Sequence, residues 1–151
     1  MSSPEKRRDY PDRPILGVGA VIIEADQVVL IRRGQEPLLG QWSIPGGVVE
    51  AGETLRAAVI REAREETGLK IEAGELLEVF ESIVPGADAR ESQYHYVVID
   101  FLCRTRAGEL RAGGDALEAR WVKREHLADF QVSDGACRVI HKAWQTADCN
   151  R

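Results

Sequence analysis

One segment in the middle of the chain constrains the fold most, because it has the composition of a helix and lies between strand-like segments. Thr54–Thr67 is rich in Ala, Glu and Arg, and Gly68 follows it where a C-cap glycine is expected. A second helix is predicted over Ser133–Ala147, with Ser133 as its N-cap. The order of strands, helix, strands and helix predicts a mixed α/β domain with an incompletely parallel sheet.

The predicted strands are short, apolar and rich in β-branched residues. Ile15–Glu24 and Val28–Arg32 are expected to form a hairpin. A short strand over Gln41–Ile44 is expected to stop at the Pro45-Gly46-Gly47 turn. Three more strands are predicted beyond the central helix, over Leu76–Val84, Tyr94–Arg104 and Ala119–Val122.

A chain of 151 residues suits one domain with a hydrophobic core and is cramped for two. Residues 1–14 are polar and contain three prolines, so we expect a flexible N-terminal arm followed by a single domain over residues 15–151. Three cysteines without CxxC spacing argue against a disulfide framework and a zinc site. No segment resembles a transmembrane helix or a secretory signal, so we expect a cytoplasmic protein that does not bind membranes.

The net charge of −5 disfavours binding to a nucleic-acid polymer, which normally needs a basic surface. The acidic excess is concentrated in one stretch. Residues 62–91 contain nine acidic and three basic residues, and the first three acids belong to the predicted central helix.

Those three glutamates project within about a 100° arc of the helix. They are Glu62, Glu65 and Glu66, and the apolar residues expected on the neighbouring, core-facing arc are Val59, Ile60 and Ala63. One interpretation is a solvated acidic face, partly relieved by Arg61 four residues before Glu65. The other is a site for a hard divalent cation, Mg²⁺ or Mn²⁺, which carboxylate oxygens bind well.

The spacing around the helix favours the cation site. Gly47 is followed after five residues by Glu53, and after seven more by the run Arg61-Glu62-Ala63-Arg64-Glu65-Glu66-Thr67-Gly68-Leu69. This 23-residue pattern resembles the Nudix box at every fixed position, with Ala63 small for its aliphatic position. The chain is therefore similar to the Nudix hydrolase family.

The resemblance implies an α/β/α sandwich with a mixed β-sheet, and an enzyme that hydrolyses a nucleoside diphosphate linked to another moiety by attack of water on phosphorus. Carried over onto matching positions, it implies that Glu62, Glu65 and Glu66 coordinate Mg²⁺ or Mn²⁺, with the Gly46 carbonyl as a backbone ligand. Arg61 would orient a glutamate. Glu53 would support the loop or ligate a further metal ion.

Residues outside the central pattern have less defined roles. The general base is left open between Glu62 and Glu118, with Asp115 as a weaker alternative. Arg33, at the end of a predicted strand, is a candidate for binding a substrate phosphate. Tyr94 and Tyr96 are assigned either to core packing or to a nucleoside pocket. Two tryptophans are assigned to packing, Trp42 and Trp121.

The substrate is a small-molecule nucleotide whose identity stays open. The segments YPDRPILGVGAVII, YHYVVIDFLCR and EARWV resemble bacterial proteins of the ADP-ribose pyrophosphatase-like group, which implies hydrolysis of ADP-ribose to AMP and ribose 5-phosphate. MutT-like hydrolysis of nucleoside triphosphates and hydrolysis of dinucleoside polyphosphates are alternatives. A non-catalytic nucleotide sensor is a further alternative, against which the complete set of box acids argues. The resemblance also admits a homodimer.

Overall fold

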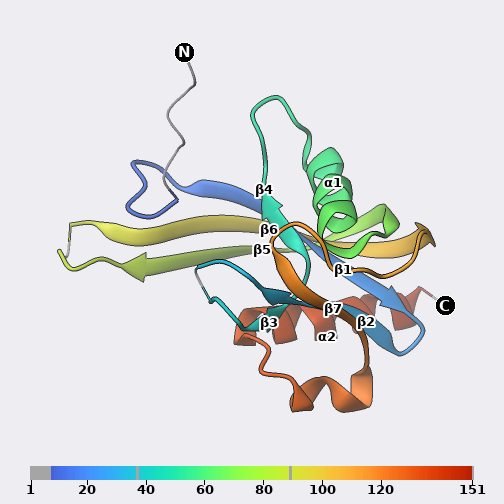
Figure 1. Ribbon diagram of the computed structural model, residues 1–151. Helices are drawn as coiled ribbons and strands as arrows, with labels where there is room; N and C mark the ends of the chain where they lie inside the picture. Colours follow the sequence, from blue (N-terminus) through green and yellow to red (C-terminus); the bar gives the residue numbers. More distant parts are fainter. Residues whose placement is uncertain (1–7, 37, 89, 151) are drawn as a thin grey trace.

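The computed structural model describes residues 8–36, 38–88 and 90–150. Its elements, labelled in Figure 1, follow in chain order: β1 (Ile15–Glu24), β2 (Gln27–Arg33), β3 (Trp42–Ser43), β4 (Gly46–Val48), α1 (Leu55–Thr67), β5 (Lys70–Pro85), β6 (Ser92–Ala107), β7 (Ala116–Lys123), a 3-10 helix (Arg124–Asp129) and α2 (Asp134–Cys149).

The strands form a mixed sheet in the order β3-β2-β1-β6-β5. β1 runs parallel to β6, with Ile15 opposite Tyr96, whereas β2 and β4 pair with β1 in the antiparallel direction. β7 is antiparallel to β2, and β5 is antiparallel to β6 at the end of the strand order. The predicted mixed sheet is confirmed.

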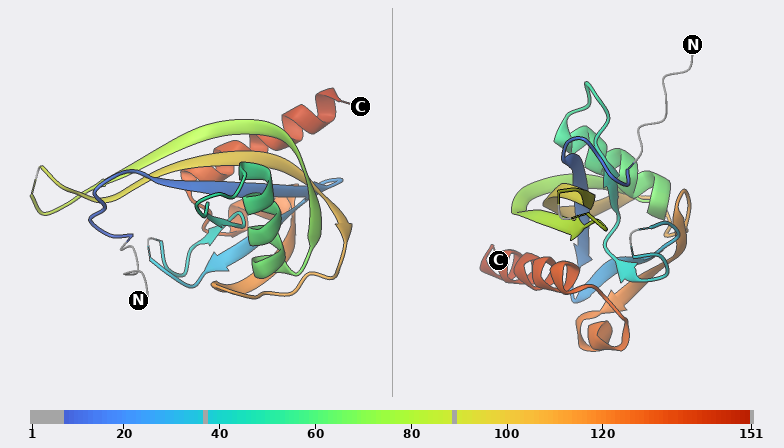
Figure 2. Two further views of the ribbon diagram at one scale, coloured as in Figure 1. Left: turned by 90° about the horizontal axis from the view of Figure 1, so that it is seen from above. Right: turned by 90° about the vertical axis from the view of Figure 1, so that its left-hand side faces the viewer.

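The two α-helices cover opposite faces of this sheet (Figures 1 and 2). Side chains alternate along β1, so that Ala20 and Ile22 pack in the cluster beneath α1 while Val21 packs in the cluster beneath α2. Val59 of α1 and Ile140 of α2 are fully buried in these two clusters. The architecture is the predicted α/β/α sandwich, with a core on each face of the sheet.

Helix α1 begins and ends where its sequence signals predict. The Thr54 hydroxyl accepts a hydrogen bond from the Ala57 N–H at 3.1 Å, and Gly68 has the left-handed φ of +73° expected of a C-cap. The prediction that Ile60 faces the core is wrong, because Ala58 lies on the buried side instead and Ile60 is 40% exposed.

Several strands differ from their predicted bounds. β5 begins at Lys70 rather than Leu76. Residues 70–75 are partly polar and include Gly74, but irregularities in the pairing allow this segment to stay beside β6. The Pro45-Gly46-Gly47 turn does not simply stop a strand, since Gly46 begins β4. β4 can pair with β1 because both strands are glycine-rich at their contact, where a Cβ on Gly46 would collide with the Val18 carbonyl oxygen.

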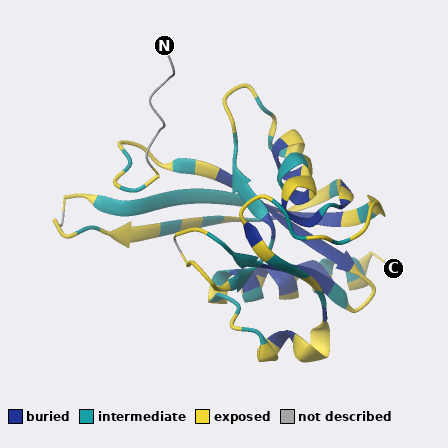
Figure 3. Cartoon of the chain, viewed as in Figure 1, coloured by how far each residue is buried: buried dark blue, intermediate teal, exposed yellow. Residues whose placement is uncertain are grey.

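The far ends of β5 and β6 project from the domain as a long hairpin, seen at the left of Figure 1. Figure 3 shows that this hairpin is only partly buried. Val79 is 58% exposed and Ile83 is 54% exposed. The Tyr10 N–H donates to the Gln93 carbonyl of this hairpin at 2.7 Å. Residues 1–7 of the predicted arm lie outside the described residues.

No helix in the described part of the chain is both long enough and apolar enough to cross a membrane.

Candidate functional site

A cavity of about 300 Å³ lies between the two helices, where β1, β4, β5 and β6 meet the N-terminal end of α2. Its wall at one end includes Glu62 and Glu66 of α1 together with the glycines of β4. Its lining also includes Val98 and Asp100 of β6. The predicted acidic helix therefore faces a concave site.

The backbone of β4 passes close against α1 at this cavity. A Cβ on Gly47 would collide with the carboxyl group of Glu62, and one on Gly17 of β1 would come within 3.2 Å of the Gly47 carbonyl oxygen. Glycine at position 47 thus allows the β4 backbone and the Glu62 carboxyl group to share one small volume.

Arg61 of α1 forms hydrogen bonds to the loop that precedes this helix. Its Nε and Nη2 donate to Glu53 at 2.7 and 2.8 Å, its Nη1 donates to Glu62 at 2.7 Å and to Glu65 at 3.3 Å, and its Nη2 also donates to the Val48 carbonyl at 3.2 Å. The hydrogen bonds from Arg61 lower the pKa of Glu53 to about 2. Arg61 is therefore hydrogen-bonded to three glutamates, Glu53, Glu62 and Glu65.

Glu66 is the most buried of the three helix glutamates, with 7% of its surface exposed. Burial raises its pKa to about 8, and the negative charge of Glu62 adds to the rise. The Gly46 N–H opposes the rise by donating to Oε2 of Glu66 at 3.0 Å. Burial likewise raises the pKa of Glu62, against the bonds from Arg61. Two partly desolvated carboxyl groups therefore repel each other one helical turn apart.

This donor set fits a hard divalent cation. The cation would be held by Glu62 and Glu66, which both line the cavity, and by the Gly46 carbonyl beside them. Glu65 points instead toward Arg61, and its side chain is 53% exposed. Across the described residues, no group of three or more His, Cys, Asp and Glu side chains is arranged to hold a metal ion. The remaining positions around such a cation would therefore fall to water and substrate oxygens.

Of the other residues predicted for the site, some line the cavity and one does not. Arg33 and Asp115 line the cavity, and Gln35 Nε2 donates to Oδ1 of Asp115 at 3.0 Å. Glu118 lies on β7, where it is paired with Arg32 at 3.0 Å, and it is absent from the described residues that line the cavity. Of these two candidates for the general base, Asp115 lies at the cavity and Glu118 lies elsewhere on β7.

Sequence reasoning missed Asp100. Its side chain is 5% exposed, and burial raises its pKa to about 7. The signal was present, because an acidic residue interrupts the otherwise apolar run of residues 97–103 in β6. Tyr96 lines the cavity from the same face of the strand, which favours its pocket interpretation. Trp42 packs edge-on against Phe130 with ring centroids 5.1 Å apart, as its packing assignment predicts.

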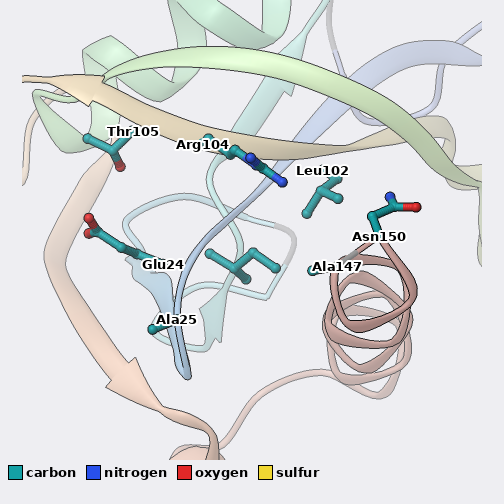
Figure 4. Close-up of a pocket in the computed structure, with 8 residues that line it drawn as sticks. Glu24, Ala25, Leu102, Arg104, Thr105, Ala147 and Asn150 are labelled. Atoms are coloured by element: carbon teal, nitrogen blue, oxygen red, sulfur yellow. The ribbon is translucent and has the colours of Figure 1, made fainter.

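A second cavity of about 320 Å³ lies between the β1–β2 turn and the C-terminal end of α2 (Figure 4). Its labelled side chains include Glu24 and Arg104, and Glu24 is the one carboxylate among the described residues that line it. Its chemistry is therefore much poorer than that of the cavity beside α1.

Comparisons with known proteins agree with this geometry. A sequence model described as the NUDIX domain matches residues 13–142. The chain is 40% identical over 114 residues to a Methanocaldococcus jannaschii protein named ADP-ribose pyrophosphatase, in an alignment that covers 76% of this chain and 64% of that protein, slightly under two thirds of its length. It is 28% identical over 140 residues to a MutT-like protein of Streptomyces ambofaciens, covering 93% of this chain and 83% of that protein.

Among solved structures, a MutT NUDIX hydrolase from Burkholderia pseudomallei superposes with a TM-score of 0.73 at 26% identity. The superposition covers 87% of this chain and 98% of that one.

Proposed function

From the premise that this chain belongs to the Nudix family of hydrolases, which act on nucleoside diphosphate derivatives, we propose that it is an ADP-ribose pyrophosphatase dependent on Mg²⁺ or Mn²⁺. The observation that carries this proposal is the pair Glu62 and Glu66, which converge on one cavity beside a backbone turn that admits only glycine. The name of the M. jannaschii relative supports the choice of substrate.

The proposed reaction adds water to the diphosphate of ADP-ribose and breaks one bond between phosphorus and the bridging oxygen, which gives AMP and ribose 5-phosphate. A divalent cation at Glu62, Glu66 and the Gly46 carbonyl would neutralise charge on the phosphate oxygens and lower the pKa of a bound water. Arg33, on the cavity wall, binds a phosphate oxygen through its guanidinium. Arg61 keeps Glu62 in place without contacting the substrate.

Asp115 is the proposed proton acceptor. Its carboxylate lines the cavity and is oriented by Gln35, whereas Glu118 is engaged by Arg32 on β7. The proton leaves the attacking water for the Asp115 carboxylate as the new P–O bond forms. Glu62, the other candidate, is already bonded to Arg61 and serves better as a cation ligand.

The test is a substrate panel in the presence of MgCl₂ or MnCl₂, containing ADP-ribose, sugar nucleotides, nucleoside triphosphates and dinucleoside polyphosphates, scored by kcat/KM. The highest value is expected for ADP-ribose. A preference for nucleoside triphosphates would instead favour the MutT-like alternative, which the name of the S. ambofaciens relative supports. Absence of turnover across the panel, with tight nucleotide binding, would favour the sensor.

Glu66→Gln is the matching variant. It should lower kcat by about 10²–10³-fold with ADP-ribose while circular dichroism stays unchanged, because it removes an anionic ligand without changing the side chain's size. Glu72→Gln is the control, since Glu72 is an exposed β5 residue paired with Arg106 away from the cavity. Full activity in Glu66→Gln would refute the proposed cation site.

The homodimer and the cytoplasmic location also remain proposals, and both rest on the resemblance and composition already described. Light scattering of the purified chain should give twice the 16.7 kDa monomer mass. A mass of one chain at micromolar concentration would refute the dimer.

A further inference from the structure

Asp100 lies in a row of residues that crosses the sheet from its edge to the proposed cation site. Glu78 of β5 is opposite Asp100, Asp100 is opposite Gly19 of β1, and Gly19 is opposite Gly46 of β4. Adjacent strands are about 4.8 Å apart, so the backbones of Asp100 and Gly46 are separated by about 10 Å. This separation is comparable with the span from phosphate to base in a nucleotide.

The carboxyl group of Asp100 has been left without a partner of its own. Oδ1 is buried and has no hydrogen-bond partner among the described residues. Its neighbour Glu78 is engaged by Arg138 of α2, with Nη2 at 3.2 Å from Oε1 and Nε donating to Oε2 at 3.4 Å. Because an unpartnered buried polar atom costs stability, the position of this carboxyl group needs an explanation other than packing.

Gly19 makes room for this carboxyl group. A Cβ at position 19 would collide with Oδ1 of Asp100 and would lie 2.8 Å from Cδ1 of Ile44. The Asp100 carboxyl therefore occupies a space that exists only because residue 19 has no side chain, and it borders the cavity rather than solvent.

The walls around Asp100 are mostly apolar. They are formed by Val98, Phe80 and, on the first turns of α2, Ala136 and Val139. The lining of the cavity also includes the polar side chains of Ser82, Tyr96 and Ser133. A largely apolar wall with a few polar groups is typical of a site that takes a flat ring and fixes its orientation by hydrogen bonds.

We propose that Asp100 is the base-recognition residue of this enzyme and accepts a hydrogen bond from the exocyclic amino group of adenine. The inference rests on the proposed function for its choice of base. With the phosphates at Gly46 and Arg33, the base of the bound nucleotide reaches the inner end of the cavity, where Asp100 is the carboxyl group among the apolar residues just named.

The ionisation of Asp100 agrees with this pairing. Burial raises its pKa to about 7, the charge of Glu78 adds to the rise, and Arg138 opposes it. A carboxyl group in its neutral form donates from one oxygen and accepts at the other. The adenine edge presents the complementary pair, an amino donor beside the N1 acceptor.

The experiment is calorimetric binding of AMP and of purine riboside 5′-monophosphate, which lacks the amino group, in MgCl₂. The wild-type protein should prefer AMP by about 10- to 100-fold in Kd, because an unsatisfied buried carboxyl group remains when the amino group is missing. Asp100→Leu, close in size and without polar atoms, should reduce this preference to within twofold. Asp100→Asn, which keeps an acceptor and a donor, should retain part of it.

A wild-type preference below threefold overturns the proposal whether or not either variant folds. An unchanged preference in a folded Asp100→Leu protein also overturns it. Neither nucleotide contains a diphosphate, so the binding ratio is independent of turnover. If ADP-ribose is hydrolysed and the preference survives in Asp100→Leu, the proposed function stands and base recognition by Asp100 fails. If ADP-ribose is not hydrolysed and the preference is lost in the variant, the reverse holds.

Discussion

Replacing Asp100 with asparagine should stabilise the protein increasingly as the pH rises from 5 to 8. In the folded chain burial raises the pKa of Asp100 to about 7, from a reference value of 3.8. Between these values the unfolded chain releases a proton that the folded chain retains, so the group destabilises the fold progressively as pH rises. Asparagine carries no titrating proton and removes this dependence.

The size of the effect follows from the pKa difference. Linkage at each pH gives a destabilisation of roughly 2 kcal/mol at pH 5 and roughly 4 kcal/mol at pH 8 for an isolated group with these two pKa values. The stability difference between Asp100→Asn and wild type should therefore grow by roughly 2–3 kcal/mol across this interval. Any constant contribution from the new amide group cancels, because it does not change with pH.

Urea denaturation followed by tryptophan fluorescence measures this difference. With an m-value of about 2 kcal/mol/M, the midpoints of the two proteins should diverge by about 1 M more at pH 8 than at pH 5. Asp148→Asn is the matched control, because Asp148 is an exposed acid that pairs with Arg124 at 3.7 Å. A stability difference that does not change with pH would refute the assignment of Asp100 as a buried acid that resists ionisation.

Three other substitutions test the site. Gly47→Ala should lower kcat and destabilise the fold by about 1–3 kcal/mol, because the new methyl group collides with Glu62. An unchanged kcat together with an unchanged free energy of unfolding would contradict the close approach of β4 to α1. Arg61→Lys should lower kcat by at least 10-fold with little change in KM, because one ammonium group cannot donate to Glu53 and Glu62 as the guanidinium does. An unchanged kcat would exclude the positioning role of Arg61. Asp115→Asn should lower kcat with ADP-ribose by about 10²-fold while Glu118→Gln lowers it less than threefold, and the opposite ranking would assign the proton acceptor to β7.

The features that could be predicted from the sequence are those that depend on local signals. Helix α1 follows from the Thr54 cap, its composition and Gly68, and the structure confirms all of these. Strand β1 follows from its apolar sequence, of which seven consecutive residues, 17–23, are buried. These signals act within a few residues, so no knowledge of distant contacts was needed.

The remaining features depend on contacts between distant segments. β4 exists because Gly46 pairs with Gly19, and Asp100 faces the cavity because β6 runs parallel to β1 in one particular register. Helical spacing predicted that Glu62, Glu65 and Glu66 share a face and that Arg61 lies near Glu65. It could not predict that Glu62 and Glu66, rather than Glu65, line the cavity. Pairing across the sheet, rather than local propensity, decides these positions.

The position of β5 at the end of the sheet gives a second meaning to the acidic stretch of the chain. An unpaired strand edge beside exposed Val79 and Ile83 is a template for the addition of strands from other molecules, and so a hazard for aggregation. Glutamates recur at every third position along β5, at 72, 75, 78 and 81. Glu78 contacts Arg138 of α2, whereas Glu81 contacts His95 of β6. These charges disfavour pairing of β5 with a strand of another molecule. This effect is independent of the chemistry beside α1.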